Sequence, residues 1–276
     1  MHSLEINPEI ALSRISRFIV KRIDDAKANG VIIGLSGGLD SSVTAALCVR
    51  ALGHEKTFGL LMPTQTTQQQ DIDDAIKIAT LLGVKYAIED ISPSLNAFKQ
   101  FQVFDPEKKL INGNLAARLR MSLLYYYANL HNWLVIGTGN KSELLVGYFT
   151  KFGDGGCDIL PLGDLYKCQV RQLADYLEIP QEIIKKMPSA GLWHGQTDED
   201  ELGTKYDTLD KILSGLEQLM IPNEISKEFD IPLEVIKKVE IMLRKSEHKR
   251  IGPIIFKMGS RTPGFDWRLS IASKET

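Results

Sequence analysis

The sequence has few cysteines, no long apolar run and almost no excess charge. Its three cysteines, Cys48, Cys157 and Cys168, include no Cys-x-x-Cys pair, which argues against a disulfide framework and a zinc knuckle. No apolar stretch reaches the length of a membrane-spanning helix, and the first residues lack the apolar core of a signal peptide. A net charge of -2 gives no general attraction to nucleic acid or to a membrane surface. We therefore expect a cytoplasmic protein without nucleic-acid or membrane partners.

A glycine-rich motif near the start of the chain, VIIGLSGGLDSS at residues 31–42, organises the rest of the sequence. Its apolar run predicts a short buried strand, and its two glycines permit a turn in which the backbone can approach a ligand closely. Asp40, Ser41 and Ser42 favour the start of a helix. A strand, a glycine turn and a helix N-terminus direct free backbone N–H groups and the positive end of a helix dipole at one place. This order predicts a phosphate site.

Two common phosphate loops do not match this motif. A Walker A loop needs a lysine before its Ser/Thr, and the dinucleotide fingerprint needs Gly-x-Gly-x-x-Gly with an acid at the end of the next strand. Here the next strand ends in Met62-Pro63. The pattern Ser-Gly-Gly-x-Asp-Ser at residues 36–41 instead resembles the pyrophosphate loop of the N-type ATP pyrophosphatases, which split ATP between its α and β phosphates. A plain Gly-Gly turn would need neither the hydroxyls nor the carboxylate.

Strands and helices alternate through the first half of the chain. The expected strands span 31–35, 57–62, 84–88 and 133–137, and the expected helices span 4–28, 43–52, 71–82, 95–104 and 115–130, with a loop at 105–114. Such alternation predicts an α/β fold with a doubly wound parallel sheet and helices on both faces. Because ligands bind beyond the carboxyl ends of such strands, the loops at Ser36, Met62 and Thr138 should face one crevice.

The second half of the chain is expected to be mainly helical. A glycine-rich loop at 148–162 precedes predicted helices at 167–177, 181–186, 206–219 and 233–245, with polar loops at 188–199 and 246–250. The glycines within 151–158 suggest a lid that orders over a bound ligand. With 276 residues, 43% of them hydrophobic, we expect a single domain over 1–276. It would comprise a nucleotide-binding core at about 29–165 and extra C-terminal helices at about 166–270.

Two acids are placed to hold a magnesium ion. Chemistry at the α phosphate of ATP needs Mg²⁺, which prefers oxygen ligands from one or two carboxylates, phosphate and water. Asp40 lies in the first loop, and Glu143 follows the fourth predicted strand. Lys151 and Lys167, near the same edge, could neutralise the charge that develops as pyrophosphate leaves.

A closer resemblance rests on several segments spread along the chain. The stretch 138–159 (TGNKSELLVGYFTKFGDGGCDI) looks like the signature of the NAD synthetases, as do 113–121 (GNLAARLRM), 198–203 (DEDELG) and 246–250 (SEHKR). Other pyrophosphatases share the Ser-Gly-Gly loop but not the segment Lys-Phe-Gly-Asp-Gly-Gly. The resemblance implies a Rossmann-like fold of the adenine nucleotide α-hydrolase type. It also implies an ATP- and Mg²⁺-dependent ligase that adenylates nicotinic acid adenine dinucleotide (deamido-NAD), after which ammonia displaces AMP to give NAD. Because the family forms homodimers through long helices, it implies a homodimer as well.

The resemblance also implies a role for each matching residue. Asp40, Glu143 and Lys167 would be catalytic, and Asp40 and Glu143 would hold the metal. ATP and pyrophosphate would bind at Ser36, Gly37, Gly38, Asp40, Ser41, Ser42, Met62, Gln69, Thr138, Lys167 and Ser189. Deamido-NAD would bind at Arg118, Phe149, Lys151, Asp154, Asp158, His248 and Lys249.

Two other readings of the motifs stay open. One is an ATP pyrophosphatase that adenylates a tRNA or another carbonyl acceptor, which the lack of paired cysteines and of a basic RNA-binding face disfavours. The other is a nucleotide sensor without chemistry, in which both metal carboxylates would be needless. About thirty residues precede the Ser36 loop, too few for the amidase domain of glutamine-using relatives, so free ammonia is the expected nitrogen donor.

Overall fold

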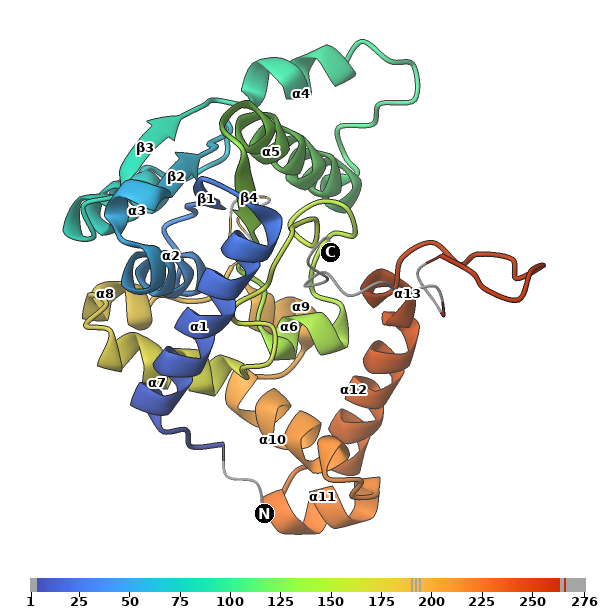
Figure 1. The fold of residues 1–276 in the computed structure, drawn as a ribbon. Coiled ribbons are helices and arrows are strands. Elements are labelled where there is room, and N and C mark those ends of the chain that lie inside the picture. The colour runs from blue at the N-terminus through green and yellow to red at the C-terminus, as the bar shows by residue number, and fades with distance from the viewer. Residues whose placement is uncertain (1–3, 190, 192, 194, 264–265, 267–276) are drawn as a thin grey trace.

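The computed structural model describes residues 4–189, 191, 193, 195–263 and 266 (Figure 1). The elements in its first half are α1 (Pro8–Ala26), β1 (Gly30–Gly34), α2 (Leu39–Leu52), η1 (His54–Lys56), β2 (Thr57–Leu61), α3 (Gln69–Leu81), β3 (Lys85–Ile88), α4 (Ser92–Phe98), α5 (Lys109–His131) and β4 (Trp133–Ile136). Those in its second half are α6 (Lys141–Val146), α7 (Lys167–Tyr176), α8 (Gln181–Ile184), α9 (Asp198–Leu202), α10 (Tyr206–Glu217), α11 (Pro222–Phe229), α12 (Leu233–Lys245) and α13 (Glu247–Arg250).

The strands form one parallel sheet in the order β3-β2-β1-β4. The register sets Val31 beside Thr57 on one side of β1 and beside Leu134 on the other. β2 and β4 therefore flank β1, and the strand order reverses at β1, which is where a doubly wound sheet opens a crevice at its carboxyl edge. The expected α/β fold with a parallel sheet is confirmed.

β1 is central because its side chains are apolar and buried on both faces. Val31 and Ile33 belong to a core cluster with residues of α1, α2, α3 and α7. Ile32 lies in a different cluster, with Leu60, Val135 and residues of α4 and α5. Helices thus cover both faces of the sheet, as predicted, and the layers are visible in Figure 1.

The helices α10, α11 and α12 build a second apolar cluster below the sheet (Figure 1). Leu209, Ile212 and Ile236 are fully buried in it. Val146 of α6 and Tyr166, just before α7, belong to the same cluster. The second cluster therefore packs directly against the two helices that follow β4. In contrast, Val170 and Leu173 of α7 pack with the sheet, so the division near residue 166 stays a prediction.

Several predicted boundaries and loops are wrong. The segment 105–114 is not all loop, because α5 begins at Lys109 and α4 ends at Phe98. Gly113 and Asn114 have low helix propensity and concealed this start, although Gly113 is buried within the helix. The predicted loop 246–250 contains α13, whose Arg250 guanidinium donates to the carbonyls of Leu144, Leu145 and Leu243.

Three further short helices were not predicted. α6 begins with a capping box in which Asn140 and Glu143 bond each other's backbone N–H groups. α9 follows the N-cap Thr197, and α11 starts with Pro222 in its first turn. Each start carries a recognised sequence signal, but helices of five to eight residues have too few turns to show an apolar period.

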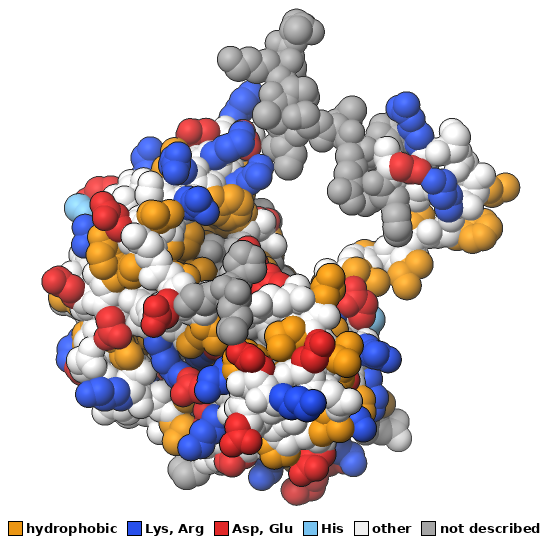
Figure 2. Space-filling view, turned by 90° about the horizontal axis from the view of Figure 1, so that it is seen from below, with side chains coloured by type: hydrophobic (Ala, Val, Ile, Leu, Met, Phe, Trp, Pro, Cys, Tyr) orange, Lys and Arg blue, Asp and Glu red, His pale blue; other side chains and the backbone are white. Residues whose placement is uncertain are grey.

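The surface carries both charge signs and one projecting segment. On the face shown in Figure 2, Lys/Arg and Asp/Glu side chains are interspersed. The chain after α13 extends away from the body (Figure 1), and Ile254, Phe256 and Met258 are exposed there. Within the described residues, no helix combines the length and the apolar character that crossing a bilayer requires.

Candidate active site

A cavity of about 750 Å³ opens at the carboxyl ends of β1, β2 and β4. Ser36, Met62 and Thr138, which follow these three strands, all line it, so the expectation that their loops share one crevice is confirmed. Predicted site residues that line the cavity are Ser36, Gly38, Asp40, Ser41, Met62, Thr138, Glu143, Phe149, Asp154, Lys167, Ser189 and Lys249.

The glycine loop has a shape that side chains would prevent. Gly37 has φ +73°, and a Cβ there would lie 2.1 Å from the backbone oxygen of Asp71 at the start of α3. Gly38 is the N-cap of α2 and supplies no capping side chain. The first N–H groups of α2 therefore have no cap from Gly38, and the first turn of α2 lines the cavity, as an anion site requires.

Hydroxyl groups hold the loop in this shape. Ser36 Oγ and Ser41 Oγ lie 3.1 Å apart, and Ser42 Oγ donates to the carbonyl of Gly38 over 2.8 Å. Lys186, beyond α8, forms ion pairs with Asp71 and Asp74 and also donates to the Gly37 carbonyl over 3.3 Å. The loop is thus fixed from both sides before a ligand arrives.

Three charged side chains converge at the edge of this loop. Lys167 Nζ, at the start of α7, lies 2.5 Å from Asp40 Oδ2 of α2 and 3.1 Å from Glu143 Oε1 of α6. Only 3% of the Lys167 side chain is exposed, against 17% for Asp40 and 15% for Glu143. A buried ammonium is stable only when it is paired, and here both carboxylates pair with it.

Neighbouring polar groups orient the two carboxylates. Asn140 Nδ2 donates to Asp40 Oδ1 over 3.1 Å, while Asn140 Oδ1 accepts the backbone N–H of Glu143. The hydroxyl of the buried Tyr206 lies 3.4 Å from Glu143 Oε1 and 3.1 Å from Asp198 Oδ2. The Tyr206 ring also lies under the ammonium of Lys167, 4.9 Å from Nζ. Asn140 and Tyr206 thus hold the charged side chains in one orientation.

The environment moves the pKa values of these groups. Burial raises the pKa of Glu143 to about 7, although the nearby Lys167 opposes the shift. Burial alone would lower the pKa of Lys167, but the carboxylates of Asp40 and Glu143 outweigh it and hold that pKa above its usual range. Lys167 therefore keeps its positive charge at neutral pH, at the edge of the cavity.

The donor set fits a magnesium ion. Asp40 and Glu143 both reach a single cationic atom, Lys167 Nζ, so their oxygens converge as ligands of one ion must. Among the described residues, no group of three or more His, Cys, Asp and Glu side chains could enclose a metal. Mg²⁺ does not require such a cage, because it binds through one or two carboxylates together with substrate phosphates and water.

Seven predicted residues do not line the cavity. A Cβ at Gly37 would point at the Asp71 carbonyl, and the Ser42 hydroxyl donates to the Gly38 carbonyl. Gln69 donates to Asp73, whereas its neighbour Gln68 lines the cavity. Asp158 accepts bonds from the Tyr125 hydroxyl and the Val135 N–H. The other three residues are Arg118, His248 and Lys151, of which Arg118 and His248 are exposed.

The glycine-rich segment 147–158 is anchored to α13 and the chain after it. Lys151 Nζ donates to the carbonyls of His248 and Ile251, and Lys249 Nζ donates to those of Gly147 and Phe149. Thr150 N–H donates to Asp154 within the segment. These bonds hold the segment against α13, and its ordering over a bound ligand stays a prediction.

Sequence reasoning also missed residues of the cavity. Arg120 lines it and donates from Nε to the carbonyl of Met62 over 3.0 Å. Asn114, Ala117, Met121 and Leu124 line the same side, and their spacing of three or four residues defines the cavity face of α5. Arg118 fits the same spacing, so the sequence alone does not separate the two arginines, and the contact with Met62 identifies Arg120.

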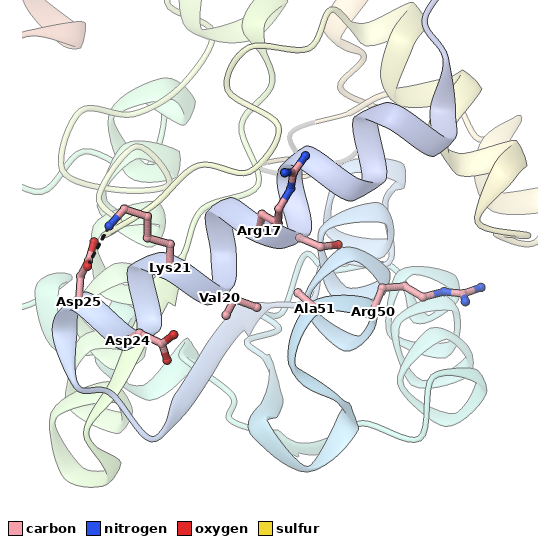
Figure 3. Close-up of a pocket in the computed structure, with 8 residues that line it drawn as sticks. Arg17, Val20, Lys21, Asp24, Asp25, Arg50 and Ala51 are labelled. Carbon is pink, nitrogen blue, oxygen red and sulfur yellow. Dashed lines mark hydrogen bonds and ion pairs between the residues drawn. The ribbon is translucent and has the colours of Figure 1, made fainter. Parts of the chain in front are cut away.

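A shallower hollow lies on another part of the surface, between α1 and the end of α2 (Figure 3). Arg17, Lys21 and Arg50 line it together with Asp24 and Asp25. Lys21 forms an ion pair with Asp25 over 3.1 Å, and Arg22 pairs with the same carboxylate. This hollow has no glycine loop and no buried charge, so the chemistry belongs to the first cavity.

Comparisons with known proteins agree with this geometry. The family model described as NAD synthase matches residues 11–253. The NH(3)-dependent NAD(+) synthetase of Methanocaldococcus jannaschii is 52% identical over 250 residues, which cover 89% of this chain and 95% of that protein. An NMN synthetase structure from Francisella tularensis has a TM-score of 0.82 and 37% identity, covering 92% of this chain and 100% of that one. An NH3-dependent NAD synthetase structure from Campylobacter jejuni, described in complex with the nitrate ion, has a TM-score of 0.77 and 35% identity with the same coverage.

Proposed function

Because the chain belongs to the NAD synthase family, we propose that it is an NH3-dependent NAD synthetase that uses ATP to amidate deamido-NAD. The observation that carries this proposal is the convergence of Asp40, Glu143 and Lys167 beside the glycine loop. A plain nucleotide-binding site has no need of two converging carboxylates around a buried ammonium.

The reaction follows from the arrangement of charges. The carboxylate of the nicotinate ring attacks the α phosphate of ATP, the bond between the α and β phosphates breaks, and pyrophosphate leaves. Ammonia then attacks the acyl carbon, AMP leaves with the bridging oxygen, and the amide loses a proton to solvent or a nearby base. Atoms balance, since ATP, deamido-NAD and ammonia yield AMP, pyrophosphate and NAD.

Each group of residues serves one step of this reaction. The N–H groups at the start of α2 and the Ser36 and Ser41 hydroxyls would hold the leaving pyrophosphate. Lys167 would offset the charge that develops between the α and β phosphates. Asp40 and Glu143 would hold Mg²⁺, which supplies electrostatic stabilisation of the phosphates.

The remaining predicted residues divide between the two nucleotides. Met62, Thr138 and Ser189 line the cavity where ATP would lie. Phe149, Asp154 and Lys249 line it near the glycine-rich segment, where the dinucleotide would lie. Arg118 and His248 are exposed in a single chain, so we assign any contact of theirs with deamido-NAD to the assembled homodimer. We place the enzyme in the cytoplasm, consistent with three free cysteines.

A mononucleotide substrate is the second candidate, because the Francisella tularensis relative is an NMN synthetase. One assay separates the alternatives. The protein is incubated with ATP, MgCl₂ and ammonium chloride, and with either deamido-NAD or nicotinic acid mononucleotide. We expect NAD, AMP and pyrophosphate in equal amounts, and a higher kcat/KM for the dinucleotide. A preference for the mononucleotide would transfer the assignment to the second candidate, and release of ADP and phosphate would contradict both.

A further inference from the structure

One buried carboxylate outside the cavity has no part in the mechanism above. Asp210, in the middle of α10, is 0% exposed. Its Oδ1 accepts the hydroxyl of Ser142 over 2.5 Å, and its Oδ2 accepts the backbone N–H of Cys168 over 2.8 Å. Ser142 belongs to α6 and Cys168 to α7. One side chain thus joins two helices that are separated by an irregular segment of twenty residues, 147–166.

A third bond closes this network. Ser142 Oγ accepts the backbone N–H of Lys167 over 3.0 Å while it donates to Asp210. The groups bonded in this network belong to a catalytic residue, Lys167, or to an immediate neighbour of one, Ser142 and Cys168. Ser142 directly precedes Glu143, and Cys168 directly follows Lys167.

Packing alone does not explain an ionisable group at this position. A buried carboxylate is costly unless its oxygens are hydrogen-bonded, and a hydrophobic side chain of similar size would fill the space at lower cost. Asp210 gains its bonds from N–H and O–H groups at the N-termini of α6 and α7, which have no partners within their own helices. The backbone bond from Lys141 N–H to the Leu165 carbonyl, 2.8 Å, is a second link between the same regions.

We propose that Asp210 is a positioning residue, which holds Glu143 and Lys167 at the separation that the reaction requires by bonding α6 and α7 through Ser142 and Cys168. The inference rests on the proposed function, since it assigns Glu143 and Lys167 to the reacting phosphates. Asp210 itself is not among the residues that line the cavity. Misplacement of such groups by about 1 Å can cost about 10²-fold in rate.

The test variant is Asp210→Leu, which has a side chain of similar shape. A leucine side chain accepts no hydrogen bond, so the bonds from the Ser142 hydroxyl and from the Cys168 N–H are both lost. We expect kcat to fall at least about tenfold and the Kd of MgATP, measured by calorimetry, to rise. The KM for deamido-NAD should change little, because Phe149, Asp154 and Lys249 do not contact this network.

Ser214→Ala is the matched control. Ser214 lies one turn further along α10 and is also buried, but its hydroxyl contacts Gln218 instead of α6 or α7. A merely structural Asp210 would make both variants lose thermal stability while kcat and MgATP affinity stay normal, and that result would overturn the inference. If Asp210→Leu does not fold, Ser142→Ala decides, since it removes the central hydroxyl and retains the Cys168 bond. Loss of kcat there supports the inference, and normal kcat and MgATP affinity contradict it. Absence of NAD formation by the unaltered protein would instead contradict the proposed function.

Discussion

Lys167 Nζ lies 2.5 Å from Asp40 Oδ2, although the two residues are 127 positions apart in the sequence. This ion pair joins the first turn of α7 to the first turn of α2, the helix that follows the glycine loop. Because both helices begin at the carboxyl edge of the sheet, a phosphate held by the loop would meet a fixed cation and a fixed carboxylate together.

The two carboxylates should be needed for turnover but not for folding. Glu143→Gln and Asp40→Asn each remove one charge and keep the shape of the side chain. We expect kcat to fall by about 10²–10³-fold, because electrostatic stabilisation at the reacting phosphate is commonly the largest single contribution to catalysis. The measurement is NAD formation against magnesium concentration, with Glu182→Gln as the control, since Glu182 is exposed and paired only with Lys77 among the bonds described. Near-normal turnover of Glu143→Gln at low magnesium would exclude Glu143 from the metal site.

The two glycines of the loop should differ in their tolerance of a methyl group. Gly37→Ala places a Cβ 2.1 Å from the Asp71 carbonyl and at φ +73°, a conformation that costs an L-residue about 1–2 kcal/mol before the clash is counted. Gly38→Ala meets only the Ser36 hydroxyl, at 3.4 Å. Urea denaturation should therefore show a large loss of unfolding free energy for Gly37→Ala and a small change for Gly38→Ala. Equal losses would show that the loop adopts another shape in solution.

The three thiols should resist alkylation while the protein is folded. Burial raises the pKa of Cys48 to about 12, that of Cys157 to about 11 and that of Cys168 to about 12. Since only the thiolate is nucleophilic, and each folded-state pKa lies well above pH 8, iodoacetamide at that pH should label the native protein far more slowly than the urea-unfolded protein. Peptide mapping assigns the labelled sites. Labelling of Cys48 at the same rate in both states would contradict its burial.

Ammonia should serve as the nitrogen donor without a second protein. Purified enzyme given ammonium chloride should form NAD at a rate that rises with pH at constant total ammonium, because only the uncharged form has a free electron pair for attack on the acyl carbon. Enzyme given glutamine freed of ammonium should form none. NAD formation from glutamine alone, in the absence of other proteins, would show this prediction to be wrong.

The sequence predicted those parts of the site that lie in local motifs. The glycine loop could be recognised because its strand, turn and helix start are contiguous, and Glu143 because it closely follows a strand end. The parallel sheet followed from the alternation of apolar periods. These features depend on neighbours in the chain and need no knowledge of tertiary contacts.

The parts that were missed depend on contacts between distant segments. Tyr206 is far from Glu143 in sequence and reaches it only because α10 packs against α6. Arg118 and Arg120 belong to one motif, and only the phase of α5 relative to the sheet determines that Arg120 lines the cavity. Asp210 has no motif around it and acquires its partners entirely through packing.

The central claim is that the carboxylate of the nicotinate ring becomes joined to AMP at this site, and the fate of its oxygens tests that claim most directly. Deamido-NAD is labelled with heavy oxygen at both oxygens of its carboxylate and supplied together with ATP, MgCl₂ and ammonium chloride. The products are then separated and analysed by mass spectrometry. An acyl-adenylate predicts one labelled oxygen in every AMP, one retained in the amide of NAD and none in pyrophosphate. Unlabelled AMP, or label recovered in inorganic phosphate beside ADP, would contradict the account.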